Sequence, residues 1–260
     1  MILLTRIKYG AVSLLLSLLS VSCGMEDYLY LYPVPAGNIN KTLNTLAVFN
    51  LPDIDLDNFY YFTCFTIYYR IYISDIDESG AIAIGNLSRI NSSLASDYAA
   101  FEPYTNSDTT ISTSMATIFK NRSYYTLTVF GDDLDSVLSK SRLNTNGNRL
   151  ADNSVTIDFS PAPGALPVIV VNGTSYPLYR SNGDGAFEPA PQERYFRNTA
   201  ELNRSENIKP AINADVVDKS DISGTRYAYV SMYIVVTGTD PNYTAIYSQP
   251  THVSFFRLPE

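Results

Sequence analysis

The stretch Phe65-Thr66-Ile67-Tyr68-Tyr69-Arg70-Ile71-Tyr72-Ile73 decides the fold class of this 260-residue chain. Two sets of residues alternate along it, one mostly aliphatic and one that carries hydroxyl groups and a charge: Phe65, Ile67, Tyr69, Ile71 and Ile73 against Thr66, Tyr68, Arg70 and Tyr72. Because successive side chains of a strand point to opposite faces, the pattern predicts a β-strand with one buried face and one partly solvent-exposed face.

A second alternating stretch lies near the C-terminus, where Ala228, Val230, Met232, Ile234 and Val236 alternate with Tyr229, Ser231 and Tyr233. Turn-forming residues follow at 237 to 242, and residues 246 to 258 are again typical of a strand, which predicts a terminal hairpin. Further strands are predicted at 42–51, 124–130 and 155–159, and a hairpin is predicted around Asn172-Gly173. One helix is predicted from Leu87 to Phe101, ending before Pro103, because Leu87, Ile90, Leu94, Tyr98 and Phe101 share one helical face. The chain is therefore expected to be mainly β and antiparallel, with one or two short helices.

The predicted strands resemble parts of a fibronectin type III module. Residues 62 to 72 are similar to the third strand of that family, and residues 226 to 233 and 247 to 253, with Ser248-Gln249-Pro250, are similar to its last two strands. The chain has no Trp, so we expect Phe49 in place of the tryptophan in the family's second strand. The resemblance implies an Ig-like antiparallel sandwich over 37–260, interrupted by residues 76–225 as an inserted β-rich segment or a second β subdomain.

The N-terminus has the three-part pattern of a secretory signal peptide. Arg6 and Lys8 precede an apolar run from 9 to 19, and small residues follow up to Cys23. The run is about half of the roughly 20 residues that a membrane-spanning helix needs. A plain signal peptide that happens to contain a cysteine is the alternative, but the cysteine lies where the hydrophobic run and the small residues end.

Leu18-Leu19-Ser20-Val21-Ser22-Cys23 resembles the lipobox of bacterial lipoproteins in the looser form found in spirochaetes, with Leu19 one place further from the cysteine than usual. The resemblance implies that signal peptide 1–22 is removed and that Cys23 is lipidated, with acyl chains such as palmitate, at the start of a tether over 23–36. Two or three acyl chains hold a protein firmly to a membrane. Gly24, rather than Asp, after the cysteine favours the outer membrane, with the surface and the periplasmic face both left open.

The composition bears on the class of partner. The net charge is −8, and removal of Arg6 and Lys8 would make the mature body more acidic. Because an acidic surface repels phosphate backbones, we expect no nucleic-acid partner. After lipidation of Cys23, only Cys64 is left, and we expect it to be a small buried apolar residue.

No motif for catalysis or cofactor binding is recognisable. His252 is the only histidine, and no Gly-x-Ser-x-Gly, phosphate loop, His-Glu-x-x-His or Cys-x-x-Cys occurs, so we expect neither an enzyme nor a cofactor. Asp53, Asp55 and Asp57 have the spacing that opens a calcium loop, but its glycine and glutamate positions hold Asn58 and Cys64. Residues 182 to 185 are similarly incomplete. Solvated turns are favoured at both places, and a calcium site near the three aspartates stays open.

A tyrosine-lined binding face for sugars or protein is a further hypothesis, although ordinary strand composition accounts for the same residues: Tyr60, Tyr61, Tyr68, Tyr72, Tyr124 and Tyr125. The sequence thus favours a non-enzymatic, membrane-anchored cell-envelope lipoprotein that presents loops to a protein or glycan partner. The alternatives are a solute-binding or polymer-degrading extracellular lipoprotein with an unrecognised carboxylate site, and a structural subunit of an envelope complex.

Overall fold

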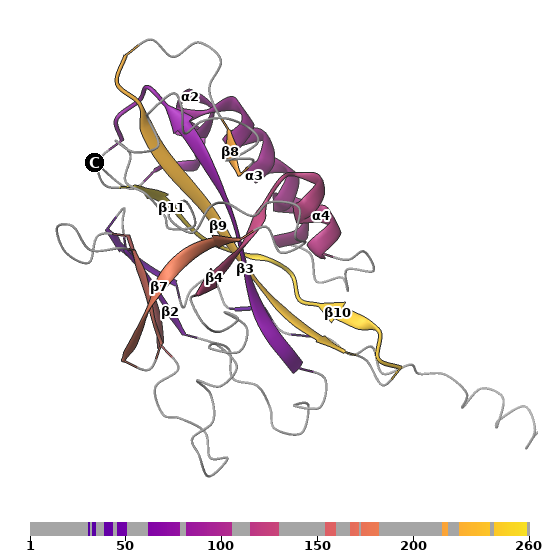
Figure 1. Cartoon of the computed structure of the whole chain (residues 1–260). Coiled ribbons are helices and arrows are strands. Elements are labelled where there is room, and N and C mark those ends of the chain that lie inside the picture. The colour runs from indigo at the N-terminus through magenta and orange to yellow at the C-terminus, as the bar shows by residue number, and fades with distance from the viewer. Residues whose placement is uncertain are drawn as a thin grey trace, which may run out of the picture.

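Two long antiparallel strands, β3 (Phe62–Ser74) and β9 (Tyr227–Thr239), cross the centre of the molecule side by side (Figure 1). They belong to a computed structural model that describes residues 31, 33–34, 39–43, 46–50, 62–78, 82–105, 115–129, 154–159, 167–171, 173–181, 215–217, 224–239 and 242–258. The pairing runs from Phe62 opposite Gly238 to Ser74 opposite Tyr227. The two stretches predicted to be strands from their alternation are therefore hydrogen-bonded neighbours.

The described strands form two sheets that are joined through one strand. The first sheet contains β3, β9, β4 (Tyr125–Val129), β10 (Ala245–Tyr247), β11 (Thr251–Arg257) and the short β8 (Val216–Val217), which pairs with β3 in parallel. The second sheet contains β1 (Ile39–Leu43), β2 (Leu46–Asn50), β5 (Ser154–Asp158) and β6 (Val168–Val171). Strand β7 (Thr174–Ser181) pairs with β6 through its first half and with β4 through its second half. A mainly β, largely antiparallel fold is thus confirmed.

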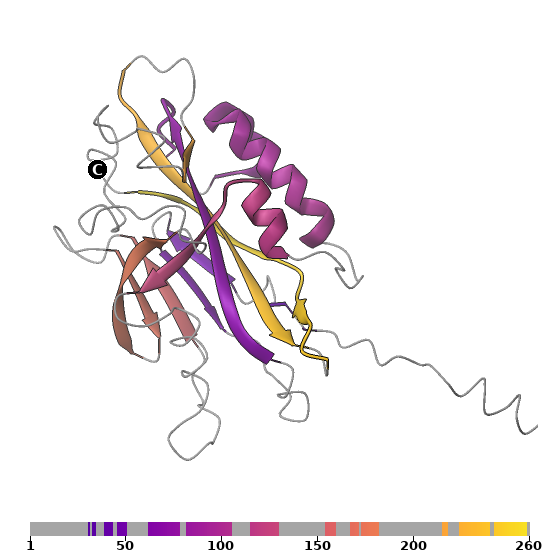
Figure 2. The ribbon, with the colours of Figure 1, turned by 45° about the vertical axis from the view of Figure 1, so that its right-hand side comes forward.

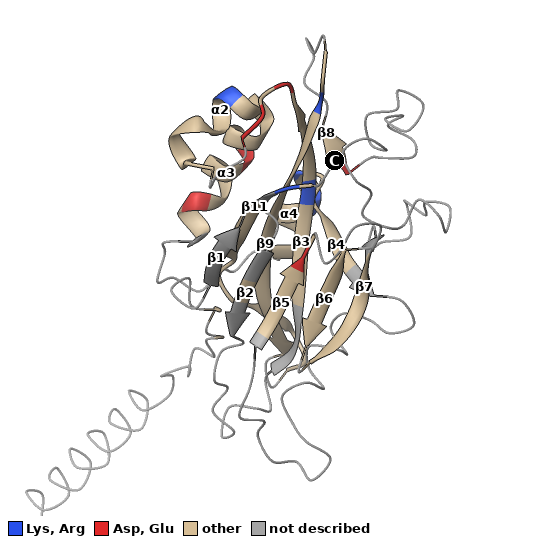
Figure 3. Ribbon diagram, turned by 90° about the vertical axis from the view of Figure 1, so that its left-hand side faces the viewer, with Lys and Arg blue, Asp and Glu red and all other residues tan. Residues whose placement is uncertain are grey.

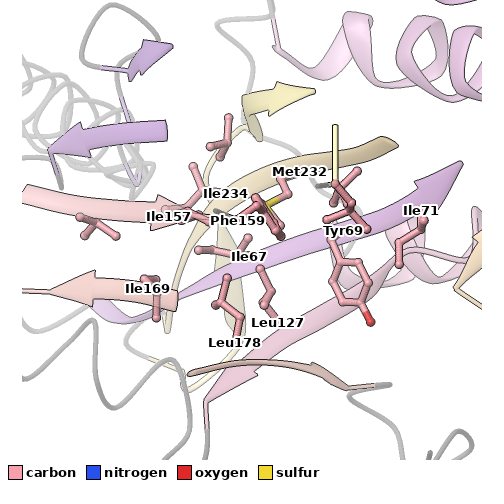
Figure 4. Close-up of a cluster of buried hydrophobic side chains, with 14 of the residues drawn as sticks. Ile67, Tyr69, Ile71, Leu127, Ile157, Phe159, Ile169, Leu178, Met232 and Ile234 are labelled. Atoms are coloured by element: carbon pink, nitrogen blue, oxygen red, sulfur yellow. The ribbon is translucent and has the colours of Figure 1, made fainter. Parts of the chain in front are cut away.

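A hydrophobic core fills the space between the two sheets. Figure 4 shows side chains of the first sheet, such as Ile67 and Ile234, pointing toward Ile157 and Ile169 of the second sheet. The predicted inner faces are confirmed, because the alternate residues of β3 from Ile67 to Ile73 and those of β9 from Ala228 to Val236 are all buried there. Burial of apolar surface contributes about 25 cal/mol per Å², which makes this core the main stabilising element of the sandwich.

Three helices cover the other face of the first sheet. Figure 2 shows them on the opposite side of β3 and β9 from the second sheet. They are α2 (Leu87–Ile90), α3 (Ser92–Thr105) and α4 (Met115–Asn121), with the short 3-10 helix η3 (Ile84–Asn86) before them. The predicted partly exposed face of β3 is therefore confirmed only in part: Thr66 and Arg70 have intermediate exposure, but Tyr68 is 6% exposed and Tyr72 is fully buried.

The helix predicted from Leu87 to Phe101 is present but differs at two points. It is interrupted at Asn91, whose extended backbone separates α2 from α3 while its side-chain amide donates to the carbonyl of Ile73. It also continues through Pro103 to Thr105. Pro103 is exposed and in the last turn of α3, where the carbonyl that loses its hydrogen bond can bind water instead. The predicted apolar face is confirmed, with Leu87, Ile90, Leu94 and Phe101 buried and Tyr98 packed against them.

Two predicted strands are divided in the structure. The strand expected at 42–51 is a hairpin of β1 and β2, and the strand expected at 246–258 is broken into β10 and β11, both of which pair with β9. The break lies at residues 248 to 250, where Ser248 donates its backbone N–H to Val236 and Pro250 has no N–H to donate. The hairpin at Asn172-Gly173 is confirmed, and Gly173 has a φ of +76°, which favours glycine.

The N-terminal segment contacts the core before the first strand begins. Val34 is 1% exposed within the core between the sheets, and Leu31 packs against the same cluster. Thr251 at the start of β11 donates its hydroxyl to the carbonyl of Val34 at 2.6 Å. Leu31, Pro33 and Val34 lie outside any strand. Part of the segment 23–36 is thus fixed to the body.

The segment 76–225 contributes strands to both sheets of the sandwich. Its strand β4 pairs with β3, and its strand β5 pairs with β2. Its helices α2, α3 and α4 cover the first sheet, as described above. The polar residues that these helices bring against β3 make up the region described next.

Candidate functional site

A buried carboxylate, Asp97, joins the helix layer to the first sheet. Asp97 lies on α3 between Leu94 and Phe101, on the face that packs against the strands, and is 4% exposed. One oxygen, Oδ2, accepts hydrogen bonds of 2.6 Å from the guanidinium of Arg70 and of 2.6 Å from the hydroxyl of Tyr72. The other oxygen, Oδ1, accepts a 3.1 Å bond from Arg122. Two arginines and a phenol thus compensate the charge that burial would otherwise penalise.

A row of hydroxyl groups continues from Tyr72 into the sheet. The hydroxyl oxygens of Tyr72 and Tyr124 are 3.0 Å apart, and that of Tyr124 is 3.4 Å from the hydroxyl oxygen of Ser231 on β9. Since the single proton of Tyr72 is directed to Asp97, the row is satisfied when each hydroxyl donates toward the carboxylate. We call Arg70, Tyr72, Asp97, Arg122, Tyr124 and Ser231 the Asp97 network.

A tight helix end places two members of the Asp97 network. After α4, Ser123 adopts a left-handed φ of 54°. The backbone N–H of Tyr124 then bonds to the carbonyl of Phe119, and that of Ser123 bonds to Lys120. This is the hydrogen-bond pattern of a Schellman motif. It reverses the chain within two residues, so that Arg122 and Tyr124 both face Asp97.

Burial perturbs the tyrosines beneath the helices. It is the main cause that raises the pKa of Tyr72 well above its usual value, and the neighbouring Tyr124 and Asp97 raise it further. Burial also raises the pKa of Tyr124 and of Tyr233. All three phenols are consequently neutral at physiological pH; Tyr72 and Tyr124 act as hydrogen-bonding groups and Tyr233 as a packing group.

An aromatic cluster surrounds the Asp97 network. The rings of Tyr68 and Phe119 stack with centroids 4.2 Å apart, and Phe101 stacks on Phe119 at 4.4 Å. His252 of β11 lies beside this cluster, with its ring 4.9 Å from that of Tyr233 and 4.2 Å from that of Phe255. The only histidine of the chain is therefore an element of packing on the helix-covered face of the sheet.

The geometry of the Asp97 network favours a structural role. Its carboxylate already accepts three hydrogen bonds, from β3 and from the turn after α4, which occupies most of its acceptor capacity. The network thus fixes α3 and the end of α4 on the sheet. Sequence reasoning missed it, although one signal was present: Asp97 is an acidic residue within the apolar face of a predicted helix.

The predicted tyrosine-lined face is not an exposed surface at its described positions. Tyr68, Tyr72 and Tyr124 are buried under the helices, while Tyr125 packs against the core between the sheets. Tyr60 and Tyr61 lie outside the described residues. The hydroxyl groups of Tyr72 and Tyr124 are instead satisfied by Asp97 and by each other.

The remaining sequence candidates have varied outcomes. Cys23, Asp53, Asp55, Asp57 and residues 182 to 185 lie outside the described residues, so the lipidation site and the possible calcium loops stay predictions. Cys64 lies in β3 opposite Thr237. Within the described part of the chain, no group of three or more His, Cys, Asp or Glu is placed to hold a metal ion. No described helix is both long enough and apolar enough to cross a membrane.

The most exposed large hydrophobic side chain among the described residues belongs to Tyr243, in the turn between β9 and β10. Tyr243 is 89% exposed and has a φ of 62°, in the left-handed region that disfavours residues other than glycine. Its neighbours Asn242, Thr244 and Ala245 are also exposed.

No family model, no curated protein and no solved structure matches the chain.

Proposed function

We propose that this chain is a bacterial cell-envelope lipoprotein, anchored in the outer membrane by acyl chains on Cys23, and that its body is a non-enzymatic binding or adhesion module. The sequence around Cys23 carries the proposal, because a signal-peptide pattern ends on a cysteine at the place where lipidation occurs. The body behind Cys23 presents the loops of its sandwich to a protein or glycan.

The fold supports a rigid platform of this kind. The Asp97 network and the inter-sheet core fix the helices and both sheets relative to one another. Within this scaffold, β3, β9 and β11 pair in the order expected for the third strand and the last two strands of a fibronectin type III module. On this basis we propose an Ig-like relationship for the first sheet.

Replacement of the cysteine tests the anchor. Cys23→Ala should move the protein from the detergent phase to the aqueous phase in a detergent phase separation of whole cells, since no acyl chain can then be attached. Cys64→Ala is the matched control and should leave the protein in the detergent phase. Retention of the Cys23→Ala variant in the detergent phase would contradict the proposed anchor.

The side of the membrane on which the body lies is tested separately, by protease treatment of intact cells with a periplasmic protein as control. Rapid loss of the mature protein while the control survives would place the body outside the cell, as adhesion requires. Protection until the envelope is broken would contradict an adhesion role.

A further inference from the structure

Tyr243 occupies a position that the fold alone does not favour. An L-residue in the left-handed region costs about 1–2 kcal/mol, which glycine would avoid. Packing within the protein does not offset this cost, because the residue is 89% exposed and its side chain buries almost no surface. The backbone thus holds an aromatic ring out into the solvent at the turn between β9 and β10. This geometry suits contact with something outside the chain.

The anchor predicted at Cys23 lies within reach of this turn. Seven residues, 24 to 30, separate Cys23 from Leu31, which packs on the core. Eight extended residues span at most about 28 Å, so the body stays close to the membrane. Three residues after Leu31, the carbonyl of Val34 accepts a hydrogen bond from Thr251, and Thr251 lies opposite Ile234 of β9. At a rise of about 3.3 Å per residue, the end of β9 next to the turn lies roughly 17 Å from Ile234. The opposite end of β9 lies roughly 23 Å from Ile234.

The chemistry of the turn suits the interface of a bilayer. The described residues Asn242, Tyr243, Thr244, Ala245, Ile246 and Tyr247 include no charge. Tyrosine is enriched at membrane interfaces, where its ring contacts the acyl boundary and its hydroxyl stays hydrated. A weak contact is sufficient here, because a short tether gives an effective concentration in the millimolar range.

The charge of the protein determines which lipid the β9–β10 turn can contact. The net charge of the chain is −8. The end opposite the turn carries Asp75, Asp77 and Glu78, and Figure 3 shows acidic residues where the chain passes from β3 toward α2. Acidic residues lower the affinity for anionic headgroups, so zwitterionic lipid is favoured.

From these observations we infer that Tyr243 rests in the headgroup interface of the bilayer that holds the lipid of Cys23, and so orients the body with the β9–β10 turn toward the membrane. The inference rests on the proposed lipidation of Cys23. It adds a second contact with the membrane, through a named residue, and leaves the end with Asp75, Asp77 and Glu78 facing away from the lipid.

Tryptophan fluorescence tests the inference directly, since the native chain contains no Trp. The Tyr243→Trp variant, produced with its full signal peptide and purified from membranes, is reconstituted in phosphatidylcholine vesicles that carry a spin label near the headgroup. We expect the emission of this variant to shift to the blue in vesicles. We also expect it to be weaker in labelled vesicles than in unlabelled ones. Partial replacement of phosphatidylcholine by anionic phosphatidylglycerol should weaken the quenching.

Ile84→Trp is the matched control, because Ile84 is 60% exposed and precedes α2, which packs over Tyr72 and Tyr229 at the other end of β9. Its emission should be unaffected by the label. Thr244→Trp probes the same turn from an exposed position if Tyr243→Trp does not fold. Quenching of the turn variants no stronger than that of Ile84→Trp overturns the inference, and a lipid on Cys23 found by mass spectrometry would then leave the anchor intact. Absence of that lipid overturns the proposed function as well.

Discussion

The carboxylate of Asp97 on α3 accepts a 2.6 Å hydrogen bond from the hydroxyl of Tyr72 on β3, and this bond ties the helix layer to the first sheet. The same oxygen accepts from Arg70, and the other oxygen accepts from Arg122. A face of the sheet that carries hydroxyl groups and a charge is thereby covered by helices while the hydroxyls of Tyr72, Tyr124 and Ser231 stay in one hydrogen-bonded row. The arrangement gives rise to measurable consequences for stability.

Replacement of Asp97 should destabilise the protein strongly. Asp97→Asn removes the counter-charge of Arg70, whose side chain is only 17% exposed, and we expect a loss of about 3 kcal/mol in the free energy of unfolding. Asp77→Asn is the matched control: Asp77 is bonded to Arg257 at 2.9 Å but is 49% exposed. Its loss should cost less than about 1 kcal/mol. Denaturant unfolding measures both, and equal effects would contradict the role given to Asp97.

Alkaline pH should unfold the protein steeply. The pKa values of Tyr72, Tyr124 and Tyr233 are raised in the folded state, chiefly by burial, above the value of 10.0 for an exposed tyrosine. The stability that the three buried phenols contribute is intact below pH 10. Above it, the unfolded state binds fewer protons than the folded state, so stability falls by up to about 1.4 kcal/mol per pH unit for each tyrosine.

Unfolding at a series of pH values, followed by circular dichroism, measures this loss of stability. Tyr72→Phe should reduce the slope above pH 10, because one of the three phenols is removed. A stability that stays constant from pH 9 to about 11 would show that these phenols ionise equally well in both states, contrary to the account.

The turn after α4 offers a stabilising substitution. Ser123 has a left-handed backbone in the Schellman motif that positions Tyr124, so Ser123→Gly should raise the free energy of unfolding by about 1 kcal/mol. Ser96→Gly provides the comparison, because Ser96 is exposed within α3 and glycine there should lower stability by roughly 0.5 kcal/mol. Thermal unfolding of the two variants should give shifts of opposite sign. Two shifts of the same sign would contradict the assigned backbone conformation.

The strands could be predicted from the sequence because their alternation is local. Ile67, Tyr69 and Ile71 occupy every second position in β3, as Val230, Met232 and Ile234 do in β9, and all six are buried in the core between the sheets. The pairing of β3 with β9 could not be derived from the same pattern, since alternation defines the two faces of a strand and not its neighbour.

There is a physical reason why the sequence did not predict that helices cover the second face of β3. Tyr68 and Tyr72 carry polar groups that water or protein can satisfy equally well, so their pattern indicates a half-exposed face in either case. Which of the two applies depends on α3 and α4, and α4 has only seven residues, too few for a clear helical periodicity. Asp97 pointed to the answer, since an acid on an apolar helical face requires a buried partner such as Arg70.

The lipid on Cys23 is the claim on which the proposed function and the membrane contact both depend. Mass spectrometry of the intact protein, extracted from the membranes of cells that produce it from the full sequence, measures this modification directly. We predict a chain that begins at Cys23, lacks residues 1 to 22, and carries the added mass of a diacylglyceryl group on the cysteine sulfur. A chain that begins elsewhere, or one that begins at Cys23 with an unmodified thiol, would contradict the account.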